Sequence, residues 1–438
     1  MTTRRLLVLC YFYPPLAGGG VHRVLGFTRH LPAHGWTCTV VCAGEEDYWV
    51  RDDSLVAPPG VEVVRVRGGS ALSAWMAWRR RAGEPAEGRR PGAAFDRLRR
   101  LGDWWLLPDS YAPWAARARR AAEARLRHGD VDAILSTSPP DSVHLAAEPL
   151  ARHRGLPWVA DFRDPWVGLS FRVPPTAWHR ARQTELRRRV LEGADVVIAA
   201  SRTHADALRV PGSRIRRIEH LPNGYEPAVG DAPDPTPADD EVFRLVFTGT
   251  LSLMPDTELF LEALHDLLAR RPEARRRLRA TLAGPFDTGY EDRAVALGLR
   301  GIVSFPGPRP HAETRALQRR ADLLLLWKPA GADYRTMVPG KLYEYLDAGR
   351  PLLAMLDPDE EAAELVRRAG GTIVPPGGAA PGASREALAA AIEERYLAWR
   401  EGARPSSQRP AWLADHTRAR LAGRLAGVLD QLVAERAR

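Results

Sequence analysis

The sequence predicts two doubly wound α/β domains, each built on a parallel β-sheet. Three observations lead to this prediction. The chain has 438 residues, of which 45% are hydrophobic, so it is long enough for two separately cored domains. Short apolar runs, which are typical of buried parallel strands, alternate with segments of helix length. A proline-rich acidic segment divides these runs into two series.

The first series predicts an N-terminal domain over residues 1–225, and the second predicts a C-terminal domain over residues 242–404. Because helix-length segments separate the runs, the strands are expected to be parallel, with ligands bound beyond their carboxyl ends. The first series covers 6–10, 37–43, 61–66, 131–136, 158–161 and 196–199, and the second covers 245–249, 280–283, 302–305, 323–327, 352–356 and 372–374.

Two further segments complete this plan. Residues 226–241 read EPAVGDAPDPTPADDE, and their proline and acidic residues leave nothing to bury. They are therefore predicted to link the two domains. Beyond residue 404 the chain is predicted to end in an amphipathic helix at 412–436.

The formal charge of +9 is concentrated in one predicted insertion, at about 70–128. Between Trp75 and His128 there are thirteen arginines, six acidic residues and five of the thirteen tryptophans. This mixture suits an anionic membrane surface or an anionic acceptor, and a solvated insertion over packed tryptophans explains it equally well. No nucleic-acid partner is predicted, although a non-catalytic protein that binds nucleic acid or membrane is kept as an alternative.

The chain contains no apolar run of eighteen or more residues and begins without the pattern of a cleavable signal. A cytoplasmic protein is therefore expected, peripheral at the inner face of the membrane if the basic segment binds lipid. Cys10, Cys38 and Cys42 lie in strand-like runs without a histidine cluster nearby, so they are expected to pack in the core.

The first loop beyond a predicted strand carries Gly18, Gly19 and Gly20. Glycine lets the backbone approach a phosphate closely, and a helix beginning near Val21 directs its free amides to the same place. The run predicts a phosphate contact, although glycine also serves in ordinary turns. The spacing differs from the dinucleotide fingerprint and no acidic residue ends the second strand, which disfavours a nicotinamide enzyme.

The most informative motif is DYRTMVPGKLYEYLDAGRP, residues 333–351. Pro339 and Gly340 are expected to open a helix that carries Lys341 in its first turn and Glu344 one turn later. A cation and free amides suit a diphosphate, and the carboxylate can accept hydrogen bonds from ribose hydroxyls. The alternative is a surface ion pair between Lys341 and Glu344.

Lysine is rare in this chain. Of the 63 basic residues only Lys328 and Lys341 are lysines, and both lie close to this motif. The bias indicates that these two positions need a compact ammonium, so Lys328 is also a candidate donor contact, with a structural role as the alternative.

The segment PGKLYEYLDAGRP resembles the nucleotide-binding helix of the family 4 glycosyltransferases, retaining enzymes of the GT-B fold. The glycine loop, HLPAHGWTCTVVCAG, LPNGYEP and FTGTLS resemble other segments of that family in the same order, over nearly the whole chain. The resemblance implies two Rossmann-like domains that face a central cleft. It also implies that residues 405–438 pack back on the N-terminal domain, and that a nucleotide-diphosphate-sugar is the co-substrate without any separate cofactor.

The same resemblance implies that Lys341 contacts the donor diphosphate and Glu344 the ribose. Two departures are apparent. Met337 stands where the family often has a glutamate that touches the sugar, and Thr250 with Leu251 follows a strand where many members have Arg and Lys. The expected donor-binding residues are Gly18, Gly19, Gly20, Gly249, Thr250, Lys328, Arg335, Gly340, Lys341, Leu342 and Glu344.

The segment PWVADFRDPWVG, residues 157–168, places Asp161, Arg163 and Asp164 just beyond a predicted strand. Two carboxylates and a guanidinium can orient an acceptor hydroxyl, and with Lys341 they form the predicted catalytic set. The alternative is a structural Asp–Arg pair that ties the loop to the sheet. Ser138 and His144 follow another predicted strand and are expected to border the acceptor.

No metal site is predicted. The acid pairs at 357–359 and 130–132 resemble a metal-binding DxD motif, but they lie outside the expected cleft loops, and Lys341 at a helix start can stabilise a leaving diphosphate. The sequence thus predicts a hexosyltransferase-type glycosyltransferase that acts on a saccharide, lipid-linked or small-molecule acceptor. Retention of configuration is implied by the resemblance alone. A nucleotide-sugar epimerase of similar architecture is the alternative enzyme.

Overall fold

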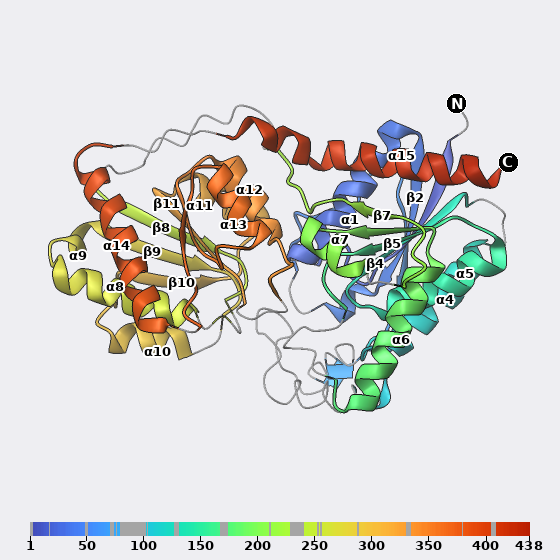
Figure 1. Ribbon diagram of the computed structural model, residues 1–438, viewed down its shortest axis with the longest axis horizontal. Coiled ribbons are helices and arrows are strands. Elements are labelled where there is room, and N and C mark those ends of the chain that lie inside the picture. The colour runs from blue at the N-terminus through green and yellow to red at the C-terminus, as the bar shows by residue number, and fades with distance from the viewer. Residues whose placement is uncertain are drawn as a thin grey trace. The chain divides into compact units, whose positions relative to one another are not determined.

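The computed structural model divides the chain into two compact units. Unit 1 is formed by Met1–Gly224 with His416–Arg438, and unit 2 by Tyr225–Asp415. Each unit holds one β-sheet (Figure 1). The structure describes residues 3–16, 18–48, 51–70, 74–75, 77–78, 102, 104–126, 131–166, 174–209, 212–227, 241–251, 254, 256–286, 289–329, 334–378, 380–403 and 409–438.

Unit 1 is built on a seven-stranded parallel sheet with the order β3-β2-β1-β4-β5-β6-β7. β1 pairs with β2 on one side and with β4 on the other, so that Val8 lies opposite both Val40 and Leu135. The strand order therefore reverses between β1 and β4. The strands are β1 (Arg4–Leu9), β2 (Trp36–Ala43), β3 (Glu62–Val66), β4 (Ala133–Ser138), β5 (Trp158–Phe162), β6 (Val196–Ala199) and β7 (Ile218–His220).

The central strands of this sheet are buried along their whole length, because helices cover both of its faces. The helices of unit 1 are α1 (Gly19–His30), α4 (Ala112–Leu126), α5 (Ser142–Arg154), α6 (Ala177–Gly193), α7 (Arg202–Leu208) and α15 (Arg418–Arg436), with the 3-10 turns η1 (Leu31–His34) and η2 (Glu45–Asp47).

The C-terminal helix α15 packs along α1 in unit 1 (Figure 1). Leu421 and Leu429 of α15 are buried in the same apolar cluster as Phe27 and Trp36. Asp430 accepts a hydrogen bond from Trp36 Nε1 at 3.0 Å. The last helix of the chain thus completes the core of the first unit.

Unit 2 repeats the plan with a six-stranded parallel sheet in the order β10-β9-β8-β11-β12-β13. Its strands are β8 (Phe243–Thr248), β9 (Leu278–Ala283), β10 (Val303–Gly307), β11 (Leu323–Trp327), β12 (Leu352–Met355) and β13 (Thr372–Val374). Its helices are α8 (Asp256–Arg270), α9 (Ala274–Arg277), α10 (Gly289–Ala296), α11 (His311–Arg319), α12 (Gly340–Ala348), α13 (Glu361–Arg368) and α14 (Pro381–Arg400), and η4 (Ala411–His416) leads back to unit 1.

The prediction of two parallel-sheet α/β domains is confirmed, and every predicted strand overlaps an observed one. β7 was missed because three half-buried residues carry no periodic pattern. Most of the predicted linker, at 228–240, and much of the basic insertion, at 79–101, lie outside the described residues. None of the helices within the described ranges is both long and apolar enough to cross a membrane.

The three cysteines lie in the core of unit 1 and form no disulfide. Burial raises the pKa of Cys38 to about 12 and that of Cys42 to about 11. The thiols are therefore protonated at neutral pH and act as small apolar side chains, as the sequence predicted.

Gly284 follows β9 with φ +144°, and its backbone touches the loop after β8. A Cβ atom at this position would lie 2.0 Å from the carbonyl oxygen of Gly249. We expect Gly284→Ala to lower the free energy of unfolding by more than about 2 kcal/mol, because the backbone must shift and this φ disfavours an L residue. Denaturant titration measures the loss. Gly289→Ala is the control, since its Cβ would meet nothing within 4 Å. Equal losses in both variants would contradict the prediction.

Candidate active site

Each sheet reverses its strand order once, between β1 and β4 in unit 1 and between β8 and β11 in unit 2. In open parallel sheets, ligands bind beyond the carboxyl ends of the strands beside such a reversal. In unit 2 this edge carries Gly249 after β8 and the start of α12. In unit 1 it carries the glycine run after β1 and Ser138 at the end of β4. The predicted site residues therefore belong to two separate edges, one in each unit.

Lys341 is the second residue of α12, and its ammonium is buried against an aromatic ring. The Nζ atom lies 3.6 Å from the centroid of the Phe247 ring and has no hydrogen-bond partner among the described residues. The surface ion pair with Glu344 that the sequence allowed is thus not formed. Burial lowers the pKa of Lys341 well below its usual value. A ring face compensates only part of the cost of burying a cation, so this position suits an anionic ligand.

Hydrogen bonds fix α12 to the end of β8 and to α11. The Tyr345 hydroxyl accepts from the Thr248 amide at 2.7 Å, and Gln318 Nε2 donates to Thr248 Oγ1 at 3.0 Å. Arg315 of α11 donates to the Glu344 carbonyl at 2.7 Å. These side chains are buried, so the first turn of α12 is positioned by rigid elements rather than by a loop.

Glu344 lies one turn after Lys341 and contacts His311, the first residue of α11. Glu344 Oε1 is 3.2 Å from His311 Nε2. The Glu344 side chain is 12% exposed and that of His311 is 26% exposed, so both reach the surface of the unit. Sequence reasoning missed His311, because its only signal is a place at a helix start 33 residues before Glu344.

Near Lys341, some parts of the backbone are accessible to a ligand, whereas others already form hydrogen bonds within the protein. Gly249 has φ +120°, a Cβ there would lie 3.4 Å from Lys341 Nζ, and Thr250 after it is exposed. Gly340 opens α12 behind Pro339. The Leu342 amide already donates to the Pro339 carbonyl at 3.0 Å, and its side chain is fully buried. Leu342 therefore serves the core, which corrects its predicted contact with the donor.

Lys328 follows β11 and holds the segment that precedes α12. Its Nζ atom donates to the carbonyls of Tyr334 at 2.5 Å and Met337 at 3.1 Å and forms an ion pair with Glu360 at 2.6 Å. An ammonium has three donors, so these contacts use its full capacity. The predicted role of Lys328 in donor binding is therefore replaced by a structural one, which the sequence had kept as the alternative.

Arg335 is half exposed and pairs with Asp357 at 3.3 Å and with Asp359 at 4.0 Å. Exposed ion pairs contribute little and exchange partners readily. Arg335 therefore stays a candidate for contact with the donor. No group of three or more His, Cys, Asp or Glu side chains that could hold a metal ion occurs in the part of the chain that the structure describes.

In unit 1 the glycine run opens α1, with Gly18 as the N-cap. A Cβ on Gly18 or Gly19 would meet nothing within 4 Å, whereas one on Gly20 would lie 3.3 Å from Arg163 Nη1. Arg163 donates to the Ser138 carbonyl at 2.6 Å and also to the Gly20 carbonyl. Arg163 therefore links the glycine loop to the end of β4. Next to this link, the backbone at Gly18 and Gly19 has free space around it.

Asp161 is fully buried, and its carboxylate is hydrogen-bonded to other side chains of the protein. It forms a bidentate pair with Arg23 at 2.9 and 2.7 Å and accepts from Thr137 Oγ1 at 2.8 Å. A direct contact with an acceptor, as predicted, does not agree with this burial. The structural Asp–Arg pair does exist, but with Arg23 rather than Arg163. Asp164 is half-buried and stays a candidate.

His144 and Ser138 are fully buried as well. The His144 ring stacks on Phe162 with centroids 4.4 Å apart, and its Nδ1 lies 2.8 Å from Ser136 Oγ. Burial lowers the pKa of His144 to about 3, so the ring is neutral at physiological pH. Both side chains lie too deep to border an acceptor as predicted, because the strand and helix that carry them pack face to face.

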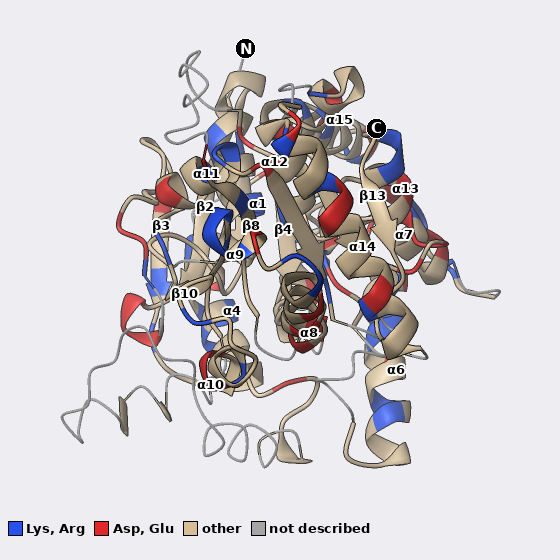
Figure 2. Cartoon of the chain, turned by 90° about the vertical axis from the view of Figure 1, so that its left-hand side faces the viewer, with Lys and Arg blue, Asp and Glu red and all other residues tan. Residues whose placement is uncertain are grey.

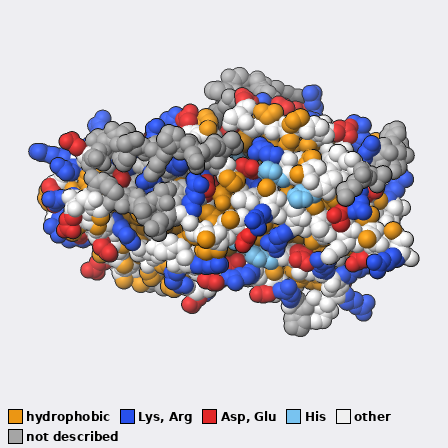
Figure 3. All heavy atoms as spheres, turned by 90° about the horizontal axis from the view of Figure 1, so that it is seen from above, with side chains coloured by type: hydrophobic (Ala, Val, Ile, Leu, Met, Phe, Trp, Pro, Cys, Tyr) orange, Lys and Arg blue, Asp and Glu red, His pale blue; other side chains and the backbone are white. Residues whose placement is uncertain are grey.

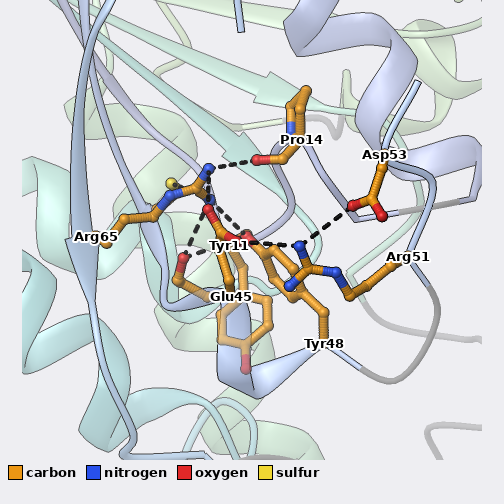
Figure 4. A network of polar contacts seen from close by, with 9 residues as sticks. Tyr11, Pro14, Glu45, Tyr48, Arg51, Asp53 and Arg65 are labelled. Carbon is orange, nitrogen blue, oxygen red and sulfur yellow. Dashed lines mark hydrogen bonds and ion pairs between the residues drawn. The ribbon is translucent and has the colours of Figure 1, made fainter. Parts of the chain in front are cut away.

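A polar network fixes the loops after β1 and β2 (Figure 4). Arg65 of β3 donates to the Pro14 carbonyl at 2.5 Å and lies 3.5 Å from Glu45. Glu45 also pairs with Arg51 at 3.3 Å, and Tyr48 donates to a backbone carbonyl nearby. This network holds the chain that leads to the glycine run. Its residues lie far apart in the sequence, so no local motif predicted this network.

Charged side chains of both signs lie on the described surface. Basic and acidic side chains are interspersed on the face seen in Figure 3, without a continuous basic surface there. Many arginines are paired with acids, among them Arg188 with Glu185 and Glu192.

Residues 18–224 match the family model described as the glycosyl transferase 4-like domain. This range runs from the glycine run to the last strand of the unit 1 sheet and includes the segment around Arg163. None of the curated protein sequences matches the chain.

Three solved structures are similar to this chain over nearly its whole length. Sucrose-phosphate synthase from Thermosynechococcus elongatus has a TM-score of 0.62 at 16% identity, with 99% of this chain and 100% of that chain covered. HepE of Anabaena in complex with UDP has a TM-score of 0.56 at 15% identity, with 99% and 98% covered. A putative UDP-N-acetylglucosamine 2-epimerase from Listeria monocytogenes has a TM-score of 0.54 at 11% identity, with 99% and 98% covered. At these identities the likeness shows the fold alone.

The fold and the family match define the class of this protein, a glycosyltransferase with two parallel-sheet domains of the GT-B fold. Residues 18–224 of its N-terminal unit match the glycosyl transferase 4-like domain, and the predicted resemblance to family 4 is confirmed. A protein described as an epimerase shares the fold. The family match is therefore what assigns the chain to the transferases.

Two buried histidines predict how stability depends on pH. Burial lowers the pKa of His144 to about 3 and that of His204 to about 4, whereas an unfolded histidine titrates near about 6.5. Below that pH the unfolded chain binds protons that the native chain does not, so stability falls as the pH drops. We expect the unfolding temperature of His144→Gln to change less than that of the wild type between about pH 7.5 and about pH 5. His153→Gln, exposed on the same helix, should follow the wild type. Parallel curves for His144→Gln and the wild type would refute this explanation.

Proposed function

We propose that this glycosyltransferase transfers a sugar from a nucleoside-diphosphate-sugar to an acceptor hydroxyl, with the donor diphosphate bound at the start of α12. The observation that carries the proposal is the buried Lys341 ammonium, which has no polar partner among the described residues and lies in the first turn of a helix. The ammonium, the free amides and the helix dipole all favour a diphosphate there. HepE, similar in fold, binds UDP, which supports a uridine nucleotide.

Charge on the leaving group is what this site is proposed to stabilise. When the bond between the anomeric carbon and the diphosphate oxygen breaks, negative charge grows beside Lys341 and the first amides of α12. The acceptor oxygen forms the new bond to the anomeric carbon, and its proton passes to a phosphate oxygen of the leaving diphosphate. Neither a protein base nor a metal ion is required for this step. Retention of configuration is part of the proposal and is supported by the resemblance to a retaining family.

Glu344 is proposed to accept hydrogen bonds from the ribose hydroxyls while His311 holds Oε1 of its carboxylate. His311 is thus a positioning residue. Met337 stands where many relatives have a glutamate, so the sugar itself is recognised by other groups. The remaining donor contacts are proposed to come from Gly249, Thr250, Arg335 and Gly340.

Unit 1 is proposed to serve the acceptor, with Asp164 as the group involved. The backbone at Gly18, Gly19 and Gly20 stays proposed, as in the sequence analysis, for contact with the donor diphosphate. Saccharides, lipid-linked saccharides and small molecules all offer the hydroxyl that the reaction needs. The proposed setting is the cytoplasm, in the synthesis of a glycoconjugate, a cell-surface polysaccharide or a natural product.

A nucleotide-sugar epimerase is the second candidate, because the Listeria protein shares the fold. An epimerase converts the donor without an acceptor. Incubation of the enzyme with a nucleotide-sugar alone would then yield the epimer, whereas a transferase yields at most slow hydrolysis.

We expect Lys341→Met to lower kcat about 100-fold or more, because the cation that faces the developing charge is lost. We also expect its unfolding temperature to equal or exceed that of the wild type, since a buried amino group without a hydrogen-bond partner has been removed. Nucleotide release and thermal unfolding measure the two effects. Arg276→Ser, exposed on α9, is the control. A loss of activity below about threefold would exclude Lys341 from the donor site.

Nucleoside diphosphates should stabilise the protein by mass action, because they bind the native state. A ligand at 100 times its dissociation constant adds about 2.7 kcal/mol to the free energy of unfolding. We expect UDP to raise the unfolding temperature more than GDP, ADP or TDP, and Lys341→Met to abolish the shift. If GDP, ADP or TDP gave the largest rise in unfolding temperature, that nucleotide would replace UDP as the proposed donor nucleotide. If none of the four raised the unfolding temperature, the proposed site would be contradicted.

A further inference from the structure

The tryptophans of the basic insertion divide into a packed pair and an exposed group. Trp75 and Trp114 are 8% and 0% exposed, whereas Trp78, Trp104 and Trp105 are 58%, 52% and 86% exposed. Packing beneath the insertion therefore explains the first pair only. Large apolar side chains that gather on a surface mark a place of contact with another molecule or a membrane.

Another exposed indole, from a distant part of the chain, lies close to Trp104. Trp178, in the first turn of α6, is 64% exposed. His179 links the two segments, because its Nε2 lies 3.2 Å from the Trp104 carbonyl oxygen and its ring lies 5.5 Å from that of Trp104 and 4.9 Å from that of Trp178. One turn later, Gln183 donates to the Pro108 carbonyl at 2.6 Å. Residues 104–108 are thus fixed on the start of α6, and Trp104, Trp105 and Trp178 form one tryptophan surface.

The surroundings of the tryptophan surface are basic. α6 carries five arginines and two glutamates (Figure 2). Arg188 and Arg189 are ion-paired, but Arg180 and Arg182 are exposed and form no ion pair with any residue that the structure describes. Arg182 comes four residues after Trp178 and therefore lies on the same side of the helix.

We propose that the tryptophan surface, together with Arg180 and Arg182, docks unit 1 on an anionic lipid bilayer. Indole rings settle at the boundary between acyl chains and headgroups, while guanidinium groups pair with lipid phosphates. Charge complementarity favours an anionic bilayer over an apolar protein groove, because both arginines would lose their water in such a groove without gaining a counter-charge. Docking of this kind brings the enzyme to acceptors at a membrane surface, and it does not rest on the proposed donor chemistry.

The test is sedimentation of the full chain with vesicles of phosphatidylcholine alone and of phosphatidylcholine mixed with phosphatidylglycerol. We expect binding to the mixed vesicles only. Trp105→Ser combined with Trp178→Ser should lower the partition coefficient about tenfold. Arg180→Ser combined with Arg182→Ser should lower it about 30-fold, and added salt should mimic that loss.

Matched controls lie in unit 2. Val295→Ser removes another exposed apolar side chain, and Arg276→Ser with Arg277→Ser removes two exposed arginines, so both should bind as the wild type does. Unchanged thermal unfolding and nucleotide binding of all variants would show that only docking is affected. The proposal is overturned if the wild type does not bind mixed vesicles, if it binds both vesicle types equally, or if the controls weaken binding as much as the surface variants do.

Discussion

The edge of unit 2 is organised around one desolvated ammonium, that of Lys341. Its Nζ atom lies over the Phe247 ring, where no polar group among the described residues balances its charge. Folding tolerates this arrangement because Tyr345 and the α11 side chains clamp α12 onto β8, and because Gly249 offers no side chain that would occupy the same space. Under the proposed function this local cost in stability has a chemical use, since an unbalanced cation at a helix start would attract a diphosphate and stabilise its charge as a leaving group.

The corresponding edge of unit 1 differs from this, because its buried charges have partners. Its charged groups are balanced from within, as in the pair of Arg23 with Asp161 and in the bonds of Arg163 to backbone carbonyls. Satisfied groups of this kind hold loops in place and leave little charge for chemistry. The glycine loop contributes open backbone instead, and under the proposed function this backbone contacts a substrate while the other unit stabilises the leaving group.

The exposed tryptophans give unit 1 a second surface, whose chemistry differs from that of the sheet edge. His179 joins a segment of the basic insertion to the start of α6, so the indoles are held by rigid contacts. An acceptor carried by a membrane and a donor dissolved in water require different surroundings. A protein with an amphipathic face on one unit and a buried cation on the other is suited to bring such substrates together.

The sequence by itself determined the strands, the parallel sheets and the place of Lys341 and Glu344 on one helix, because these depend on local periodicity and on helix geometry. It did not determine which charges are balanced. Lys328 and Lys341 look equivalent in the sequence, yet one has three partners and the other has none among the described residues, and Asp161 pairs with Arg23 rather than with its neighbour Arg163. Only the tertiary structure decided this, because solvation and pairing depend on groups that lie far apart along the chain. The same holds for His311 beside Glu344 and for Trp104 beside His179.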